Sequence, residues 1–251
     1  MPNVCDKEQQ RLLTFVTVGG GPTSCEFVSE LHDFISSDVS KWYPDLAAKV
    51  RIILVESSDH LLGPFDASLR DCECCFASEC VQEFHDFLIF FIPDVKSTFA
   101  EKRIDVRTGV AVRKVERSRP PSEFHGDLTT AVLSNGDTIP FGTLVWSAGL
   151  DSVKFVNSSP FPTGRTGRIF IDKKCAIPGF DHVFAVGDCA ANEHEPLPQL
   201  AQVAQQQGKF VADAILNMLD GKPVENEFRL FLLGSMASLG LGKGIVDLTR
   251  K

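Results

Sequence analysis

Short apolar runs separated by polar segments with helical periodicity dominate the first half of the chain. An apolar run from Leu12 to Val18 leads into three glycines, and helix-forming sequence follows from about Pro22. A second apolar run, Val50–Val55, comes next. A strand, a helix and a strand in this order predict a βαβ unit, whose two strands lie parallel in one sheet.

Three further extended runs predict a small antiparallel meander beside that sheet. Between the last two, Asn135-Gly136 is typical of a two-residue hairpin, because both central positions of a type I′ turn favour positive φ. A buried strand, Thr143–Trp146, then leads into a Ser-Ala-Gly turn. The three extended runs are Val110–Glu116, Leu128–Leu133 and Thr138–Phe141.

The rest of the chain predicts a second α/β domain. Val183–Val186 is a buried strand closed by Gly187-Asp188, and Pro198–Leu219 is a long amphipathic helix rich in glutamine and alanine. The predicted fold class is therefore α/β, with a Rossmann-like domain (parallel sheet plus antiparallel meander) over 12–146. The C-terminal part of a second Rossmann-like domain is predicted over 147–251.

Composition narrows the class of protein without naming a function. The chain has 251 residues, 43% of them hydrophobic and 23% charged, which is ordinary for a globular protein with a substantial core. The formal net charge is −8 and no basic run is present, so we expect no nucleic-acid partner. No apolar run approaches the roughly 20 residues that span a bilayer, and the polar N-terminus does not predict a targeting peptide.

The eight cysteines do not predict a disulfide framework or a metal site. Four of them crowd one segment and the rest are scattered, in a sequence without a secretory signal. The crowded segment has no matching Cys/His pair at zinc-ribbon spacing. Its cysteines are Cys72, Cys74, Cys75 and Cys80.

The glycine triplet is the strongest candidate for a binding site. In a G-x-G-x-x-G loop the first glycine makes a tight turn and the second lets a pyrophosphate approach, while the helix that follows offers N–H groups and its positive dipole end. Gly19 and Gly21 hold the first two positions, whereas Ser24 replaces the third and is expected to loosen the helix–strand packing slightly. We assign cofactor binding to Gly19, Gly20, Gly21, Pro22 and Thr23.

Glu56 is the candidate ribose ligand. It directly follows the strand Val50–Val55, where a carboxylate accepts hydrogen bonds from the adenosine ribose of a dinucleotide. Its charge would repel a 2′-phosphate, so it favours NADH over NADPH. The alternative interpretation of this region is a buried turn followed by a solvated glutamate.

A second cofactor signature is HVFAVGDCA, residues 182–190. Asp188, at the end of an apolar run, can accept hydrogen bonds from a polyol such as the ribityl chain of a flavin, and Gly187 lets the backbone approach the cofactor. The residues alone leave this interpretation balanced against a plain strand–turn–helix in which Asp188 is an N-cap.

Four motifs together resemble the type II (alternative, non-proton-pumping) NADH:quinone oxidoreductases, a family within the pyridine nucleotide-disulfide oxidoreductase-like flavoproteins. They are VGGGPTSCEFVSELHDF, VWSAG, VFAVGDCA and LAQVAQQQGK, and the resemblance covers most of the chain. It implies FAD and NADH as cofactors, with an NADH domain inserted into an FAD domain. Hydride would pass from nicotinamide to the flavin, and the electrons would then pass to a quinone. It also implies a peripheral place on the mitochondrial inner membrane and is compatible with a homodimer.

The resemblance also implies roles for single residues. Glu26 corresponds to a carboxylate close to nicotinamide and flavin, and is otherwise an ordinary acid near a helix start. Gln202 and Gln206, four apart and so on one helix face, are expected to hydrogen-bond the quinone, or else form only a polar surface. The expected cofactor contacts beyond the glycine loop and Glu56 are Ala148, Gly149, Gly187, Asp188, Ala201 and Gln202.

The sequence departs from the family in three places. The family's first G-x-G-x-x-G unit and most of its C-terminal amphipathic helix have no counterpart here, and about 73–93 looks like an insert or translated non-coding sequence. We therefore expect a piece of a longer enzyme. The alternatives are a non-catalytic nucleotide-binding or interaction protein, and another FAD/NAD(P)-dependent disulfide oxidoreductase-like enzyme.

Overall fold

The chain forms two compact units. The computed structural model describes residues 4–63, 90–91, 95–119, 127–232, 234–241 and 243–247. One unit comprises Met1–Gly149 and Gly234–Leu248, and the other Leu150–Leu233 and Thr249–Lys251. The predicted boundary after residue 146 lies close to the first break. However, the segment Gly234–Leu248, predicted as part of the second domain, belongs to the first unit. The crowded cysteines lie outside the described residues.

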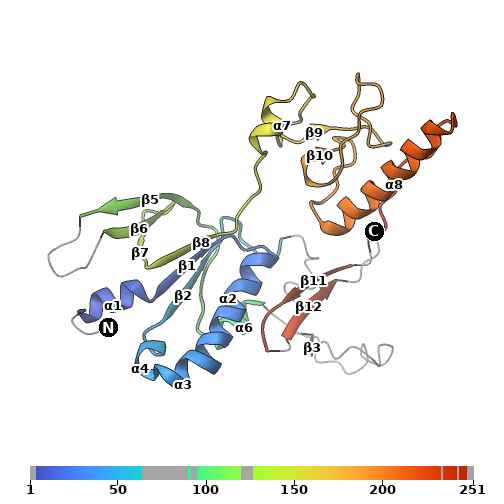
Figure 1. Ribbon diagram of the computed structural model, residues 1–251. Helices are drawn as coiled ribbons and strands as arrows, with labels where there is room; N and C mark the ends of the chain where they lie inside the picture. The colour runs from blue at the N-terminus through green and yellow to red at the C-terminus, as the bar shows by residue number, and fades with distance from the viewer. Residues whose placement is uncertain are drawn as a thin grey trace. The chain divides into compact units, whose positions relative to one another are not determined.

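A four-stranded parallel sheet organises the first unit. Its strand order is β4-β2-β1-β8, and α2 (Pro22–Phe34) is the first helix of the crossover from β1 to β2 (Figure 1). The predicted βαβ unit is therefore confirmed, although the strand begins later than expected because Leu12 still belongs to a helix. The strands are β1 (Thr14–Val18), β2 (Arg51–Val55), β4 (Asp105–Arg107) and β8 (Thr143–Trp146).

The crossover between β1 and β2 is long, because α2 continues into a π-helical turn and two short helices. This length explains why Glu56 follows the glycine loop by more residues in the sequence than is usual in such units. Among the described residues, the unit's other helices are α1 (Asp6–Leu12), η1 (Ile35–Val39), α3 (Ser40–Trp42), α4 (Pro44–Ala47) and α6 (Val95–Glu101).

Both faces of the sheet are buried, as a parallel sheet requires. Successive side chains of a strand point to opposite faces, so β2 divides its apolar residues between two cores. Ile52 and Leu54 pack with α2, α6 and a C-terminal hairpin, whereas Ile53 and Val55 pack against the meander. This division holds the carboxyl end of β2, and with it Glu56, in place.

The meander consists of β5 (Val112–Ser118), β6 (Leu128–Leu133) and β7 (Thr138–Pro140). A hairpin does form at Asn135-Gly136, but the predicted type I′ turn is wrong, because Gly136 has a positive φ (92°) and Asn135 does not. The Leu133 carbonyl accepts from Gly136 N–H, and the Asn135 side chain accepts from Asp137 N–H. A three-residue turn ending in a left-handed glycine replaces the two-residue one.

A C-terminal hairpin that the sequence analysis did not predict also packs in the first unit. Its strands, β11 (Ser235–Ser238) and β12 (Lys243–Asp247), are antiparallel, and β12 pairs with β3 (Phe90–Phe91). A buried ion pair between Lys102 and Asp33 of α2 (2.7 Å) lies against the hairpin turn at Gly240. A Cβ at Gly240 would clash with the Asp33 carboxylate, so the turn needs glycine.

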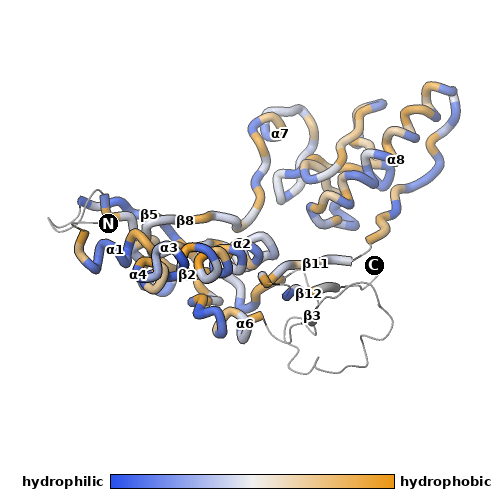
Figure 2. The backbone as a smooth tube through the Cα atoms, turned by 60° about the horizontal axis from the view of Figure 1, so that its bottom comes forward, coloured by the Kyte–Doolittle hydropathy of each residue, from blue (hydrophilic) through white to orange (hydrophobic). Residues whose placement is uncertain are grey.

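The second unit has little regular sheet. Two-residue strands β9 (Ile169–Phe170) and β10 (Ala190–Ala191) pair in parallel, and the unit also contains α7 (Lys154–Ser158), η2 (Gly187–Cys189) and α8 (Ala201–Leu219). The predicted strand Val183–Val186 is not formed. Among the described residues, its β-pairing is limited to one isolated bridge, between Phe184 and Ala176. The predicted long helix is confirmed as α8, whose hydrophobic and hydrophilic residues alternate along its length (Figure 2).

Within the described part of the chain, no helix has the combination of length and hydrophobicity needed to cross a bilayer.

Candidate functional site: two glycine turns

The first candidate site is the turn between β1 and α2. In the strand order β4-β2-β1-β8, the chain passes from β1 to β2 and β4 on one side, and β8 is added later on the other side of β1. The strand order therefore reverses between β1 and β8, which is called a topological switch point. Ligands of open parallel sheets bind at such a point, outside the carboxyl ends of the strands. The Gly19–Gly21 loop and the Ser147–Gly149 turn meet there, since Gly19 lies against Ala148.

Gly19 and Gly20 are glycines for structural reasons. Gly19 has a φ of 115°, and a Cβ on it would lie 3.1 Å from the Ala148 backbone. Its N–H donates to the Val55 carbonyl (2.8 Å), which joins the loop to the end of β2. A Cβ on Gly20 would lie 2.7 Å from both Glu56 Cγ and Leu61 Cδ2. Larger residues at either position would therefore displace the turn itself.

Gly21 is different, because the space around it is open. It is the N-cap of α2, its φ of −75° suits any residue, and a Cβ there would meet no atom within 4 Å. No side chain caps the helix, so the N–H groups of its first turn are available to an anion. Pro22 occupies the first helical position, where it costs no hydrogen bond, and Thr23 follows in the first turn.

Ser24 does not loosen the packing as expected. Its side chain is fully buried, and its hydroxyl hydrogen-bonds that of Ser147 at 2.6 Å. Ser147 N–H in turn donates to the Val18 carbonyl. A serine in the third motif position therefore ties the start of α2 to the end of β8 across the switch point. The neighbouring Gly149 has a positive φ (72°) and open space around it.

Glu56 lies against the glycine loop. Its carboxylate accepts hydrogen bonds from Gly20 N–H and from Ser58 N–H (2.7 Å). Burial alone would raise the pKa of Glu56, but the hydrogen bonds from Ser58, Gly20 and Ser57 outweigh it, and the pKa lies below its ordinary value. The group is therefore ionised at neutral pH, at the strand end where a ribose would bind.

Glu26 faces the C-terminal hairpin. Its carboxylate accepts a hydrogen bond from Ser238 N–H (3.1 Å), a residue more than two hundred positions away in sequence. The position near nicotinamide and flavin that the family resemblance implies for Glu26 remains a prediction. The adjacent Cys25 thiol is buried, which raises its pKa to about 12, so it remains protonated and unreactive.

The second candidate site is the turn Gly187-Asp188 in the second unit. Gly187 has a φ of 72°, and a Cβ there would lie 3.2 Å from Ala204 Cβ of α8. The Asp188 side chain is exposed, and it does not cap the turn as the alternative interpretation required. Arg168 Nε donates to the Asp188 carbonyl (3.0 Å), and its guanidinium also interacts electrostatically with the Asp188 carboxylate.

The glutamines of α8 take three different positions. Gln202 and its neighbour Ala201 are exposed. Gln206 pairs with the backbone of Phe231 through both of its amide atoms, with Nε2 donating (2.8 Å) and Oε1 accepting (3.0 Å). Gln206 would have to release Phe231 to contact a quinone, so its predicted role as quinone ligand stays a prediction.

Gln207 is the residue that the sequence analysis missed. It is only 3% exposed, and its Oε1 accepts from Gly187 N–H at 2.7 Å. The signal was present, because Val203, Gln207, Val211 and Ala214 share one helical face and Gln207 is the polar member of that apolar stripe. A buried polar residue in such a stripe needs a partner, and here the partner is the Gly187-Asp188 turn.

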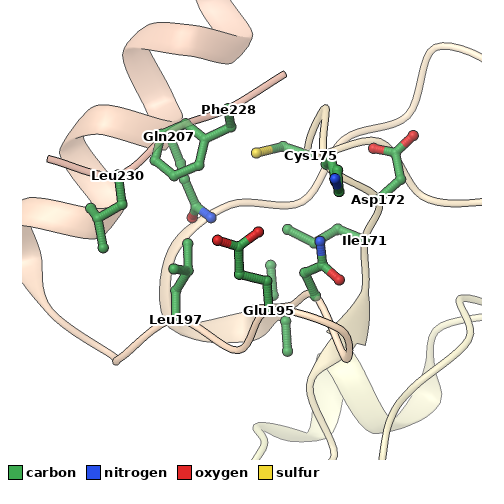
Figure 3. Close-up of a pocket in the computed structure, with 12 residues that line it drawn as sticks. Ile171, Asp172, Cys175, Glu195, Leu197, Gln207, Phe228 and Leu230 are labelled. Carbon is green, nitrogen blue, oxygen red and sulfur yellow. The ribbon is translucent and has the colours of Figure 1, made fainter. Parts of the chain in front are cut away.

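A small cavity lies beside this contact (Figure 3). Its volume is about 30 Å³, which is large enough for a water molecule. Gln207 and Glu195 extend into it toward each other, between the apolar walls Leu197 and Phe228. Cys175 also lines the cavity, and burial raises the pKa of its thiol to about 11. Among the described residues, no group of three metal-ligating side chains is present.

A glycine loop at the switch point of a parallel sheet and a Gly-Asp turn packed on a helix are both typical of dinucleotide-binding α/β proteins. The family model for "Pyridine nucleotide-disulphide oxidoreductase" matches residues 91–208. In sequence, the chain is homologous to alternative NAD(P)H-ubiquinone oxidoreductases, as the following relatives show.

The chain is 34% identical over 250 residues to a probable NADH dehydrogenase of Dictyostelium discoideum, covering 98% of this chain and 48% of the relative. It is 32% identical over 262 residues to the mitochondrial internal alternative NAD(P)H-ubiquinone oxidoreductase A1 of Arabidopsis thaliana, covering 99% of this chain and 44% of the relative. An NDH2 structure from Plasmodium falciparum in complex with NADH has the same fold, with a TM-score of 0.74 at 18% identity, covering 99% of this chain and 60% of that one. The chain thus spans about half the length of the curated relatives it matches.

Proposed function

We propose that the first unit binds NADH, that the second contributes to an FAD site, and that the whole protein passes electrons from NADH through FAD to a quinone without pumping protons. The residues 12–146 and 147–233 would supply the two sites. This proposal extends to the whole protein what its relatives' names say of them, because the chain spans only about half of their length.

The observation that carries the NADH site is the open space at Gly21. Gly19 and Gly20 are needed for the shape of the loop, but nothing in the described chain requires glycine at position 21. A residue without a side chain is needed there when another molecule approaches the backbone, as a pyrophosphate does at a helix N-terminus.

The residues of the first unit then have separate tasks. The first turn of α2 donates N–H groups to the pyrophosphate. Glu56, ionised and anchored by Ser58, accepts from the ribose hydroxyls and disfavours a 2′-phosphate. Ala148 and Gly149, beside the loop, leave room for the rest of the dinucleotide.

The second unit fits a flavin nucleotide at the Gly187-Asp188 turn. The exposed Asp188 carboxylate is free to accept hydrogen bonds from a polyol, and Gly187 leaves no side chain between the turn and α8. FAD, when bound, supplies the hydride and electron-transfer chemistry. Ala201 and Gln202 on the exposed start of α8 are the proposed residues beside the flavin ring and the quinone.

The membrane and the assembly belong to the same proposal. Several relatives are named mitochondrial ubiquinone oxidoreductases, some internal and some external. We infer a peripheral place on the mitochondrial inner membrane for the whole protein, where it meets a membrane quinone, and a homodimer as its assembly.

The test is an NADH titration of the chain and its Gly21→Ala variant, followed by nicotinamide fluorescence. The added methyl group meets no protein atom, so the stability of the variant should be unchanged. It would extend toward the pyrophosphate, and we expect NADH binding to weaken about tenfold, or roughly 1.4 kcal/mol.

The control is NADPH, which should bind more weakly than NADH to the parent chain and nearly as well as NADH to Glu56→Gln. Equal NADH affinity of the parent and Gly21→Ala, in two folded proteins, would overturn the proposed site. A purified chain that binds NADH and fails to take up FAD would favour the non-catalytic alternative for this chain.

A further inference from the structure

The Gly187-Asp188 turn is held from outside by three side chains. Gln207 Oε1 accepts from Gly187 N–H (2.7 Å). Arg168 Nε and Gln199 Nε2 both donate to the Asp188 carbonyl, at 3.0 and 3.1 Å. The backbone on each side of the turn is therefore restrained, while the Asp188 carboxylate itself remains exposed.

We propose that Gln207 is the positioning residue of this turn, the residue that holds the Asp188 carboxylate in the orientation a flavin nucleotide needs. This inference rests on the proposed FAD site. It assigns to Gln207 a role distinct from the quinone contact expected of Gln202 and Gln206.

Burial makes the Gln207 contact the strongest of the three. Gln207 is 3% exposed, whereas Gln199 is exposed and Arg168 is only partly buried. A hydrogen bond to a buried backbone N–H cannot be replaced by water without cost, since a buried donor left unpaired loses its full solvation. Loss of the Gln207 acceptor would therefore release Gly187, but loss of Gln199 would be compensated by solvent.

The direction of the Gln207 amide is also determined. An N–H can only donate, so the atom 2.7 Å from Gly187 N must be the amide oxygen. Nε2 then extends into the cavity toward Glu195 (Figure 3). A glutamate at position 207 would keep the acceptor, because burial beside Glu195 favours its protonated form, whose O–H can extend toward Glu195 as Nε2 does. Methionine, of similar length, would remove the acceptor.

The regular structure around the turn cannot hold it alone. The neighbouring ladder, β9 with β10, has two residues in each strand. The left-handed φ of Gly187 is also a conformation that the chain adopts only where its surroundings require it. Gln207 of α8, together with Arg168 and Gln199, therefore supplies the rigidity that a longer sheet would give, and a carboxylate must be held rigidly to bind a polyol well.

The experiment compares Gln207→Met, Gln207→Glu and the matched surface control Gln205→Met in the full chain. The first readout, which needs no cofactor, is the hydrogen-exchange rate of the Gly187 amide by NMR. We expect at least a tenfold increase in Gln207→Met, and rates close to those of the parent in Gln207→Glu and Gln205→Met. Unchanged exchange in a folded Gln207→Met overturns the proposal.

The second readout is the dissociation constant for added FAD, measured by quenching of flavin fluorescence. We expect Gln207→Met to raise it about tenfold and Gln207→Glu to restore it, whereas a faster-exchanging turn with unchanged FAD affinity overturns the positioning role. If the parent chain does not bind FAD, the flavin part of the proposed function fails for this chain, and the positioning role toward flavin fails with it. The exchange result then shows separately whether Gln207 holds the turn.

Discussion

The two glycine turns of this protein both contain a glycine with a positive φ, at Gly19 and at Gly187, but different structures support them. The Gly19–Gly21 loop leaves a four-stranded sheet that is buried on both faces, and the end of β2 holds it through the Val55 carbonyl and the Glu56 carboxylate that follows. The Gly187-Asp188 turn adjoins a ladder of two-residue strands, and the side chains of Gln207, Arg168 and Gln199 hold it. A turn supported by a sheet depends on glycine, whereas a turn supported by side chains depends on those side chains.

The largest expected effect is a steric one in the first turn. Gly19→Ala forces a φ of 115° on a residue with a Cβ, 3.1 Å from the Ala148 backbone, and should lower the free energy of unfolding by about 2–3 kcal/mol. Both tryptophans, Trp42 and Trp146, lie in the first unit, so urea unfolding followed by their fluorescence reports on it directly.

Gly187→Ala is the matched change in the second turn and should cost less, about 1–2 kcal/mol, because a φ of 72° is accessible to alanine and the Ala204 methyl can shift. Hydrogen exchange in the second unit measures it. A larger loss at Gly187 than at Gly19 would contradict the difference between the two settings.

The next effect concerns Asp188, the acid proposed to bind the flavin nucleotide. Asp188→Asn keeps the size of the side chain and removes its charge, and should weaken FAD binding about tenfold without changing hydrogen exchange at Gly187, because the backbone contacts of the turn are kept. A change in both quantities would mean that the Asp188 side chain shapes the turn. Flavin fluorescence and NMR give the two measurements.

The link between Ser24 and Ser147 should contribute about 1 kcal/mol, the usual net value of a hydrogen bond within a protein. Ser24→Ala and Ser147→Ala should each lower the stability of the first unit by that amount, and the double variant by little more than either alone, as for partners in one interaction. Chemical denaturation of the four proteins completes the cycle. Strictly additive losses would show that the two hydroxyls act independently.

The smallest expected effect is a dependence on pH. Because the folded-state pKa of Glu56 lies below its ordinary value of 4.5, its contribution is present above that value and is lost as the pH falls through the folded-state pKa. Stability measured from pH 7 downward should therefore fall less steeply in Glu56→Gln than in the parent chain. Identical pH profiles would show that the hydrogen bonds from Gly20 and Ser58 do not stabilise the loop.

Local sequence signals predicted the first unit well and the second unit only in part. The alternation of apolar residues and the glycine triplet predicted β1, α2 and β2, because these elements are made from contiguous residues with clear periodicity. In the second unit, the apolar run Val183–Val186 predicted a strand that does not form. A strand depends on neighbours distant in sequence, and one bridge to Ala176 is the described extent of its pairing.

The C-terminal hairpin shows the same limit for a whole element. Nothing local indicates that Ser238 should pack on Glu26, or Gly240 on Asp33, because each pair is separated by more than two hundred residues. The predicted domain 147–251 includes this hairpin because the sequence does not show its partner, whereas the structure places Gly234–Leu248 in the first unit.

The sequence by itself determined the nucleotide-binding class of the protein, because the glycine loop, the acid after β2 and the Gly-Asp turn are local motifs whose chemistry needs only a few adjacent residues. Only the tertiary structure decided which glutamine of α8 contacts the Gly187-Asp188 turn, and that the Ser24 hydroxyl pairs with that of Ser147. The physical reason is the same in both cases. The role of a buried polar side chain depends on the group with which it forms a hydrogen bond, and that group comes from a distant position in the chain, as Gly187 does for Gln207 and Ser147 for Ser24.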